Sequence, residues 1–401
     1  MSNLSLVNSF YGVDPPGNCL PGPYRPFGLV RLSPDVAYGR PTSGYRSGRP
    51  ILTFSHTHVA GTGGGGRYGN VGLMPFRGHP QRNGAPPFLQ PKLDTRGETI
   101  PSSETGGPGY YTATLFKGSI RVELTSTPHV GVHRYTFQGA GPDSVLLSSG
   151  SVISAGAHPP GEINPSEAWD SGGVSIGGYL EVVSESELIG RSDFRGGWGH
   201  HKPYSIYFVA RFSQPWDSIG LANRGGVLPQ VGFPLIIGEQ CSAALSYELD
   251  RNSAESNESH RNADARQLEV AVGISFVSVA RARDSIDREV GDRSFDTLRE
   301  EARNEWARHL DPVRTEGPEF VRRVFHSSHH RLLAMPTDLG INAENPFWKS
   351  GVRQFTDIYC LWDSVRNANS LLFLLEPDLS RDLLNALVDM GEQTGWIPDA
   401  H

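Results

Sequence analysis

The sequence predicts an antiparallel β-sandwich followed by a helical region. One observation is strand-like alternation, as in residues 268–276, where every second residue from Leu268 to Phe276 is large and apolar. The other is the distribution of glycine, because of 47 glycines only five lie beyond residue 291. Turn-rich sequence therefore gives way to sequence with helical spacing near that point. We predict a sandwich domain over residues 1–280 and a linker helix with further helices over residues 281–401.

The strands of the predicted sandwich are separated by glycine and proline turns. Apolar residues alternate with polar ones over 120–124, and residues 133–137 have the pattern of the returning strand of a pair. Residues 14–28 contain too many prolines for a helix or a central strand, so they predict an ordered loop. Residues 251–266 lack large apolar side chains and predict a solvated hairpin loop. The predicted core of the sandwich includes Val122, Leu124, Ile206, Phe208, Val272 and Ile274.

Helical spacing begins at Ser294, and each helix is expected to bury one apolar stripe. The second helix opens after Pro318 and closes before Pro336. Two further helices are expected over about 354–375 and 378–390. The stripe of the first helix consists of Phe295, Leu298, Ala302, Trp306 and Leu310. The stripe of the second consists of Val321, Val324, Phe325, Ser328 and Leu332.

Composition excludes several classes of partner. The net charge is −7 and no block of lysine and arginine occurs, which argues against nucleic acid. No run of 18 apolar residues suggests a membrane span. The three cysteines, Cys19, Cys241 and Cys360, are widely spaced and decide little about the redox compartment. The N-terminus lacks the basic and apolar regions of a signal peptide, so either the protein is intracellular or this form starts after the signal.

The least generic segment is 51–70, where a strand-like run delivers His56 and His58 and then a glycine loop. Residues two apart on a strand point to the same face, and glycines allow a ligand or another backbone to approach closely. This combination predicts a binding function. The alternative is that the histidines and glycines simply pack the end of the strand against a neighbour.

Two further interpretations of the glycine loop are weaker. A dinucleotide loop needs a helix directly afterwards, and the sequence from Arg67 to Pro75 cannot form a long one. A phosphate loop needs Gly-Lys-Ser/Thr, which is missing from this segment. The two histidines could serve as zinc ligands, but no third ligand follows at a diagnostic spacing.

Two groups of polar residues in the helical region also invite a functional interpretation. His326, His329 and His330 have helical spacing, which fits either a metal site or histidines satisfied within the fold. Asp363 and Arg366 interrupt an apolar helix face, where an unpaired charge is unfavourable. They meet either a ligand or each other at i, i+3.

Several motifs occur in order along the chain: Val7-Asn-Ser-Phe-Tyr-Gly, Gly22-Pro-Tyr-Arg-Pro-Phe-Gly, Phe54-Ser-His-Thr-His-Val-Ala-Gly-Thr-Gly, Val130-Gly-Val-His-Arg-Tyr and Leu361-Trp-Asp-Ser-Val-Arg. Together they resemble the family-92 glycoside hydrolases, which are calcium-dependent, exo-acting α-mannosidases. The resemblance implies an N-terminal β-sandwich followed by the first helices of an incomplete (α/α)6 barrel. It also implies an active site in the cleft between these two parts.

The resemblance assigns roles to particular residues. His56, His58 and the glycine loop are expected to face the cleft, and Trp198 to form an apolar wall. Asp363 is expected to hydrogen-bond the hydroxyls of the released mannose, with Trp362 and Arg366 beside it. The expected reaction is inverting, Ca²⁺-assisted removal of terminal α-linked, chiefly α-1,2-linked, mannose from N-glycans or mannans. Members of the family are typically secreted or periplasmic.

The resemblance also places the family's general acid and general base beyond the position of His401. The loop Gly64–Asn70 departs from the pattern of many members and leaves the linkage preference open. We therefore expect the chain to be inactive alone and to self-associate through exposed helix faces. The alternative function is a non-catalytic β-sandwich that binds glycans or a protein partner.

Overall fold

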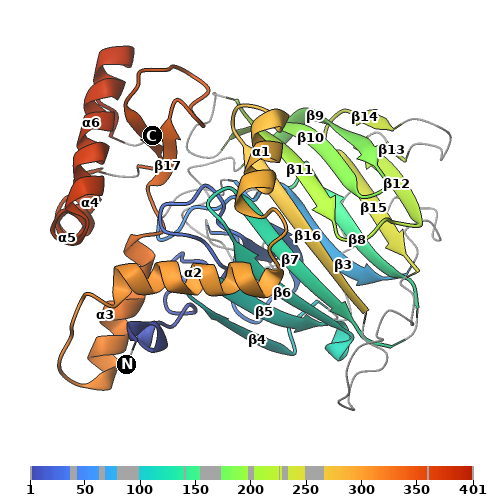
Figure 1. The fold of residues 1–401 in the computed structure, drawn as a ribbon, viewed down its shortest axis with the longest axis horizontal. Helices are drawn as coiled ribbons and strands as arrows, with labels where there is room; N and C mark the ends of the chain where they lie inside the picture. The colour runs from blue at the N-terminus through green and yellow to red at the C-terminus, as the bar shows by residue number, and fades with distance from the viewer. Residues whose placement is uncertain are drawn as a thin grey trace, which may run out of the picture.

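The structure is a computed structural model that describes residues 2–36, 43–62, 68–78, 99–139, 141–153, 173–196, 203–224, 226–227, 234–248, 266–358 and 361–399. Two large antiparallel sheets make up the N-terminal part, and helices with one small hairpin make up the C-terminal part (Figure 1). This arrangement confirms the predicted order of a β region followed by a helical region. The barrel expected from the resemblance remains a prediction.

The first sheet has seven strands. Its order is β1 (Ser33–Val36), β2 (Ile51–Ser55), β3 (Gly72–Arg77), β8 (Asp143–Ser148), β15 (Ser242–Tyr247), β12 (Ser218–Asn223) and β13 (Gly226–Val227). The second sheet has nine strands. Its order is β14 (Leu235–Ile237), β9 (Gly173–Ser184), β10 (Glu187–Gly196), β11 (Tyr204–Phe212), β16 (Arg266–Ser275), β7 (Val130–Phe137), β6 (Ile120–Ser126), β5 (Tyr110–Leu115) and β4 (Ser103–Gly107).

The main hydrophobic core lies between the two sheets, because one side chain in two along each strand points inward. All six predicted core residues belong to it, and none is more than 1% exposed. The prediction from alternation is therefore confirmed at these positions. Of the predicted loop 251–266, only Arg266 lies within the described residues, as the first residue of β16.

Helices α1 (Val279–Glu289) and α2 (Phe295–Leu310) pack on the outer face of the nine-stranded sheet (Figure 1). Both are capped by serine, since the Ser278 hydroxyl accepts from the Arg281 amide and the Ser294 hydroxyl from the Thr297 amide. The predicted stripe of α2 is confirmed, because all five of its residues are fully buried.

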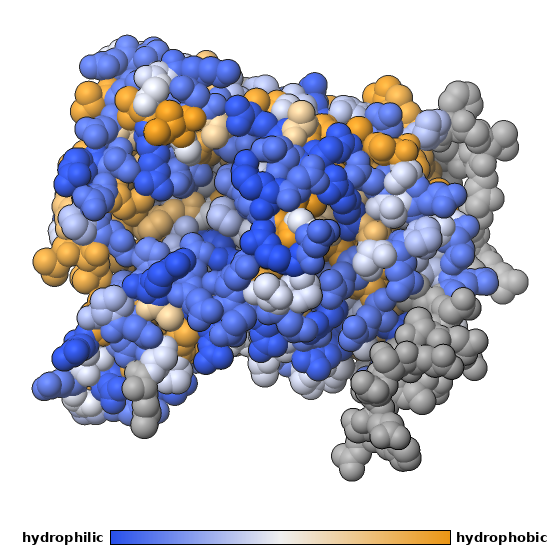
Figure 2. Space-filling view, in the orientation of Figure 1, coloured by the Kyte–Doolittle hydropathy of each residue, from blue (hydrophilic) through white to orange (hydrophobic). Residues whose placement is uncertain are grey.

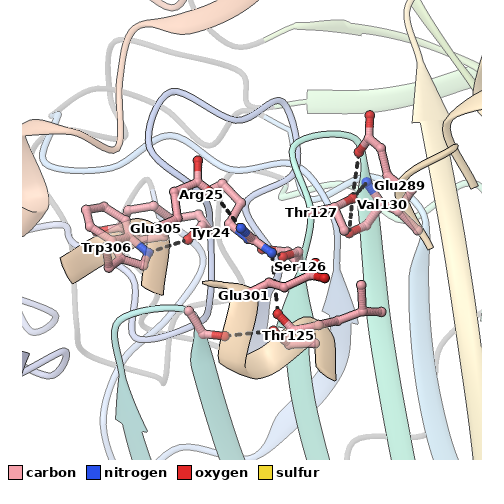
Figure 3. A network of polar contacts seen from close by, with 12 residues as sticks. Tyr24, Arg25, Thr125, Ser126, Thr127, Val130, Glu289, Glu301, Glu305 and Trp306 are labelled. Carbon is pink, nitrogen blue, oxygen red and sulfur yellow. Dashed lines mark hydrogen bonds and ion pairs between the residues drawn. The ribbon is translucent and has the colours of Figure 1, made fainter. Parts of the chain in front are cut away.

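Polar contacts also hold α2 against the sandwich (Figure 3). The Arg25 Nε donates to the Ser126 carbonyl at 2.6 Å, and the Arg25 guanidinium forms an ion pair with Glu305. The Trp306 indole N–H donates to the Tyr24 carbonyl at 2.9 Å. These contacts make α2 a part of the sandwich surface.

The remaining elements are α3 (Glu319–Leu332), the hairpin of β17 (Thr337–Ile341) and β18 (Arg353–Thr356), α4 (Leu361–Ser364), α5 (Ala368–Leu375) and α6 (Pro377–Thr394). Short 3-10 turns occur at Asn3–Leu6 and Phe116–Gly118. Pro377 begins α6, and Gly395, with φ of 85°, ends it. None of the described helices is long and apolar enough to cross a membrane.

The predicted apolar stripe of α3 is wrong. Val321 is 53% exposed, whereas the buried face consists of His326, Ser327, His329 and His330. The histidine face is buried because aromatic side chains from distant segments pack against its imidazole rings. The Tyr24 hydroxyl lies 3.0 Å from His330 Nδ1, and the Trp306 ring centroid lies 4.2 Å from that of His330.

The predicted helix over 354–375 is also wrong in its first part. Residues 353–356 form β18, where Thr356 pairs with Thr337, and helical structure resumes only at α4. Asp357 follows β18 with φ of 59°, a left-handed conformation that interrupts a right-handed helix. The periodic apolar residues therefore belong to two short helices and a strand.

Candidate functional site

The His-x-His motif lies where the sandwich meets the helical part, directly after β2. His56 Nδ1 lies 2.5 Å from the Val71 carbonyl oxygen, and its Nε2 lies 3.1 Å from Nε2 of His133. His58 Nδ1 lies 2.5 Å from the Arg31 carbonyl oxygen. Both rings are fully buried. Neither ring has the exposed surface that the expected contact with a substrate in a cleft needs.

Burial sets the protonation of this pair of histidines. Desolvation lowers the pKa of His56 to about 4, and it lowers the pKa of His133 well below its ordinary value. Both rings are therefore neutral near pH 7, and one Nε2 donates to the other. Such rings serve the fold as hydrogen-bonding spacers between β2 and β7.

Ser55, His58 and Asp35 form a cluster that superficially resembles a catalytic triad. Both the Ser55 hydroxyl, at 3.1 Å, and Asp35 Oδ1, at 3.0 Å, contact the same ring nitrogen, Nε2 of His58. In a triad the nucleophile and the acid contact opposite nitrogens of the imidazole. The Ser55 hydroxyl also donates to Asp35 Oδ2 at 2.6 Å, and the whole cluster is buried. The cluster is structural.

A buried ion pair joins the histidine segment to the helical part. The Arg31 Nη2 donates to Asp357 Oδ2 at 2.5 Å, and both side chains are 2% exposed. Arg31 also donates through Nε to the His58 carbonyl at 2.6 Å. The Tyr68 hydroxyl donates to Asp357 Oδ1 at 2.9 Å, and the Thr337 hydroxyl donates to Oδ2 at 2.5 Å. The Asp357 carboxylate therefore binds side chains from three other segments of the chain.

Three residues of this junction have left-handed backbone conformations. Tyr68, Val71 and Asp357 have φ of 66°, 56° and 59°. For residues with a Cβ this conformation costs about 1–2 kcal/mol each. Such conformations persist where the surroundings determine them strongly, and they are frequent at functional sites. The junction is thus held in one specific arrangement.

The predicted binding residues of α4 lie shortly after Asp357 in the chain. Trp362 is 58% exposed, and Asp363 and Arg366 are also exposed. In the part of the chain that the structure describes, no ion pair joins Asp363 to Arg366. The alternative in which the two residues satisfy each other is therefore not observed. One turn presents a carboxylate, a guanidinium and an indole ring to the surface.

These three groups suit a polyol ligand. A carboxylate accepts hydrogen bonds from two neighbouring hydroxyls, a guanidinium donates to oxygens, and an indole ring covers apolar C–H surface. Sequence reasoning found these residues but missed Arg31, Tyr68 and Asp357. A charged residue inside the apolar run 29–32 was the available signal for Arg31. Trp198 and the loop residues 63–67 lie outside the described residues.

Two cavities among the described residues lie away from this turn. One of about 840 Å³ lies between α2 and the turn at 105–108, and one of about 730 Å³ lies between α6 and the β17–β18 hairpin. Neither is lined by a predicted site residue. We place the candidate site at α4 because its exposed groups have suitable chemistry, whereas cavity size alone does not identify a function.

The described residues do not provide an evident metal site. Within the described ranges, no three His, Cys, Asp or Glu side chains converge closely enough to hold a metal ion. The metal interpretation of His326, His329 and His330 is therefore not supported. The calcium ion that the resemblance implies remains a prediction.

This chain spans about half the length of the known proteins that it matches. An uncharacterized secreted glycosidase of Arthroderma benhamiae is 24% identical over an alignment of 409 positions, which covers 99% of this chain and 46% of that protein. The Glycosyl hydrolase family 92 N-terminal domain matches residues 6–275, and the Glycosyl hydrolase family 92 catalytic domain matches residues 281–401.

Solved structures show the same fold. A family GH92 α-mannosidase from Bacteroides thetaiotaomicron superposes with a TM-score of 0.80 at 20% identity, covering 98% of this chain and 50% of its own. An inverting mannosidase of the same family and bacterium gives a TM-score of 0.75 at 19% identity, covering 100% of this chain and 50% of its own. The matched domains, in this order over nearly all of the chain, show that it belongs to glycosyl hydrolase family 92.

Proposed function

We propose that this chain provides the substrate-binding part of an exo-α-mannosidase that acts on terminal α-linked, chiefly α-1,2-linked, mannose of N-glycans or mannans. Membership of the family supports glycoside hydrolysis. The inverting mannosidase named among the similar structures supports inversion as the stereochemical course. The observation that carries the proposal is the exposed turn with Trp362, Asp363 and Arg366.

Each residue of the turn has one task in this proposal. The Asp363 carboxylate accepts hydrogen bonds from sugar hydroxyls, and Arg366 donates to a sugar oxygen. Trp362 covers an apolar face of the ring and excludes water. The Arg31–Asp357 pair positions the turn through the backbone that follows β18.

Inverting hydrolysis also needs two carboxyl groups about 6.5–9.5 Å apart, one as acid and one as base. We assign neither role to a residue of this chain. Calcium, if the intact enzyme uses it, supplies charge stabilisation at the sugar hydroxyls. The side chains described here bind and orient the sugar.

Asp363→Asn tests the proposal by titration calorimetry of the purified chain with mannoimidazole, the inhibitor bound in one of the similar mannosidase structures. A hydrogen bond to a charged group contributes about 1.5–3 kcal/mol, so affinity should fall tenfold or more. Asp378→Asn is the matched control, because Asp378 is an exposed carboxylate of α6 with 89% side-chain exposure. Equal affinity of the Asp363 variant and the wild type would refute the assignment.

A second candidate function is non-catalytic glycan binding, because the α4 turn supplies binding groups alone. Release of mannose from α-1,2-mannobiose distinguishes the two functions. We expect no release by the purified chain itself, and release by a longer protein that contains this chain and the two carboxyl groups. Binding without release in such a longer protein would favour the second function.

A further inference from the structure

Four neighbouring strands at one end of the nine-stranded sheet carry a row of side chains in register. Ile237 of β14 pairs with Tyr179 of β9, Tyr179 pairs with Arg191 of β10, and Arg191 pairs with Tyr207 of β11. Directly paired residues of antiparallel strands point to the same face. The residues next to them in sequence, Leu180, Ser192 and Phe208, are buried inside, so the row points outward. We call Tyr179, Arg191 and Tyr207 the tyrosine row.

The middle of the tyrosine row is locked by polar contacts. Arg191 donates to both carboxylate oxygens of Asp193, at 2.8 Å each, and the Ser205 hydroxyl donates to Asp193 Oδ1 at 2.5 Å. The Arg191 guanidinium carbon lies 5.9 Å from the centroid of the Tyr207 ring. A bidentate pair fixes the plane of the guanidinium. The Arg191 guanidinium is therefore held in one orientation, and its charge is neutralised by Asp193.

The tyrosine row is partly open to solvent. Helix α1 packs on the adjoining part of the same face, over Ile189 and Val209. Tyr179 and Tyr207 are each partly exposed, and Ile237 at the end of the row is 67% exposed. Figure 2 shows apolar residues over β14 at the upper right, beside polar surface. The described part of this face thus carries both aromatic and polar groups that are partly open to solvent.

We propose that the tyrosine row is a second carbohydrate-binding site, separate from the α4 turn, and that it takes a neutral oligosaccharide. Aromatic rings present an electron-rich face to the C–H groups of a pyranose ring. The phenol hydroxyls and the Asp193 carboxylate offer partners for sugar hydroxyls. The paired charges of Arg191 and Asp193 give no net charge that would attract a polyanion such as nucleic acid.

The spacing of the row fits a chain of sugars better than a single unit. Neighbouring strands lie about 4.8 Å apart, so the backbones that carry Tyr179 and Tyr207 lie roughly 10 Å apart. Two rings at that separation contact different units of one oligosaccharide. Simultaneous contacts with one chain strengthen binding beyond either contact alone. The inference rests on the proposed function only for the identity of the sugar, mannose.

The test is the binding of an α-1,2-linked mannotriose to the purified chain. Binding is measured by NMR chemical-shift changes and by titration calorimetry. Tyr179→Ala and Tyr207→Ala should each weaken binding about tenfold, the scale of truncating an aromatic anchor. Tyr11→Ala is the matched control, because Tyr11 is a tyrosine outside the row with 44% exposure. Thermal unfolding of each variant shows whether it is folded.

Four outcomes decide the inference. Loss of binding in both row variants with unchanged binding in Tyr11→Ala supports it. Loss of all binding in Asp363→Asn with none in the row variants overturns it, while the proposed function stands. Equal losses in Tyr11→Ala and the row variants overturn it as well. No saturable binding of mannotriose by the folded wild type at millimolar concentration also overturns it.

Discussion

Arg31 and Asp357 lie 326 positions apart in the sequence and form an ion pair at 2.5 Å that is almost completely buried. Two carbonyls besides that of His58 accept from the same guanidinium, those of Gly28 at 3.2 Å and Ala334 at 3.0 Å. This satisfies most of the donors of Arg31, as a buried charge requires. The pair therefore couples the sandwich to the segment that leads into α4.

Asp357→Asn should lower the free energy of unfolding by about 3–5 kcal/mol, because it leaves the Arg31 charge buried without its counter-ion. Asparagine tolerates the left-handed conformation at this position, so the backbone contributes little to the loss. Urea unfolding followed by circular dichroism measures the effect. Glu239→Gln is the control, because Glu239 pairs with Arg224 at the surface and such pairs contribute about 0–1 kcal/mol. Equal midpoints for the Asp357 variant and the wild type would contradict the interpretation.

His329 should make the protein less stable in mild acid. The ring is 1% exposed, and neither of its nitrogens has a hydrogen-bond partner among the described residues. Burial, and to a smaller degree nearby His326, lowers its pKa to about 4. In the unfolded chain the histidine has a pKa of about 6.5, so between pH 6.5 and 4 it is protonated there but neutral in the folded protein. The contribution of the neutral His329 ring to the free energy of unfolding is therefore fully present above pH 6.5, and it decreases as the pH falls from 6.5 towards 4.

His329→Phe should flatten this dependence by one proton, which corresponds to about 1.4 kcal/mol per pH unit. Thermal or urea unfolding at several pH values measures the slope for both proteins. Comparison at pH 8 is the control, since there the two differ only by packing. A variant with the same slope as the wild type between pH 6.5 and 4 would show that His329 is not the titrating group.

Exposed apolar side chains of α4, α5 and the residues after α6 should cause self-association. Leu374 is 76% exposed and Trp396 is 73% exposed, and the Leu361 amide donates to the Asp399 carbonyl at 3.2 Å, which brings the last residues beside α4. Figure 2 shows apolar surface at the left edge, where α4 and α5 lie. Contiguous apolar patches of this kind promote association.

Light scattering over a range of protein concentrations should therefore show a rising average mass, and Leu374→Arg should reduce it. Ile237→Arg is the control, because Ile237 is 67% exposed but lies on β14. A monodisperse monomer at every concentration would disprove the prediction. An equal effect of both variants would place the association elsewhere.

Limited proteolysis tests the predicted sandwich domain over residues 1–280. Because α1 and α2 bury apolar residues against the nine-stranded sheet, we expect protection to extend through Leu310. The first cut should fall in the exposed segment 311–318 and leave a resistant N-terminal fragment. Mass spectrometry identifies the fragment. Early cutting within residues 119–212 would show that the strands there are not stably formed.

The strands and α2 could be predicted because their patterns depend on local spacing alone. Val122 and Leu124 alternate with polar residues in a strand with one buried face, and Trp306 lies in a stripe of period 3.6. The apolar spacing of α3 gave a wrong prediction of its buried face, because that face consists mainly of histidines. Tyr24 and Trp306, which pack on His330, come from distant segments and leave no signal near residue 330.

The candidate site shows the same limit. The sequence singled out His56 and His58 correctly as unusual, but nothing local tells a histidine in the core from one in a cleft. Among the deciding partners of these rings, Asp35 and His133 lie on other strands and Val71 directly precedes β3. Asp363, by contrast, lies on a short exposed turn, so its availability to a ligand depends little on distant residues.

The Arg31–Asp357 pair sets a rule for building chimeric enzymes. A sandwich joined to a foreign helical part would contain the buried Arg31 cation without its counter-ion. A helical part joined to a foreign sandwich would contain the unpaired Asp357 anion. Each half is therefore destabilised in a host protein that lacks the oppositely charged residue at the matching position. An exchange at the predicted boundary near residue 280 separates the two positions, so it succeeds only if the host supplies the matching residue or both positions are replaced by apolar residues of similar volume.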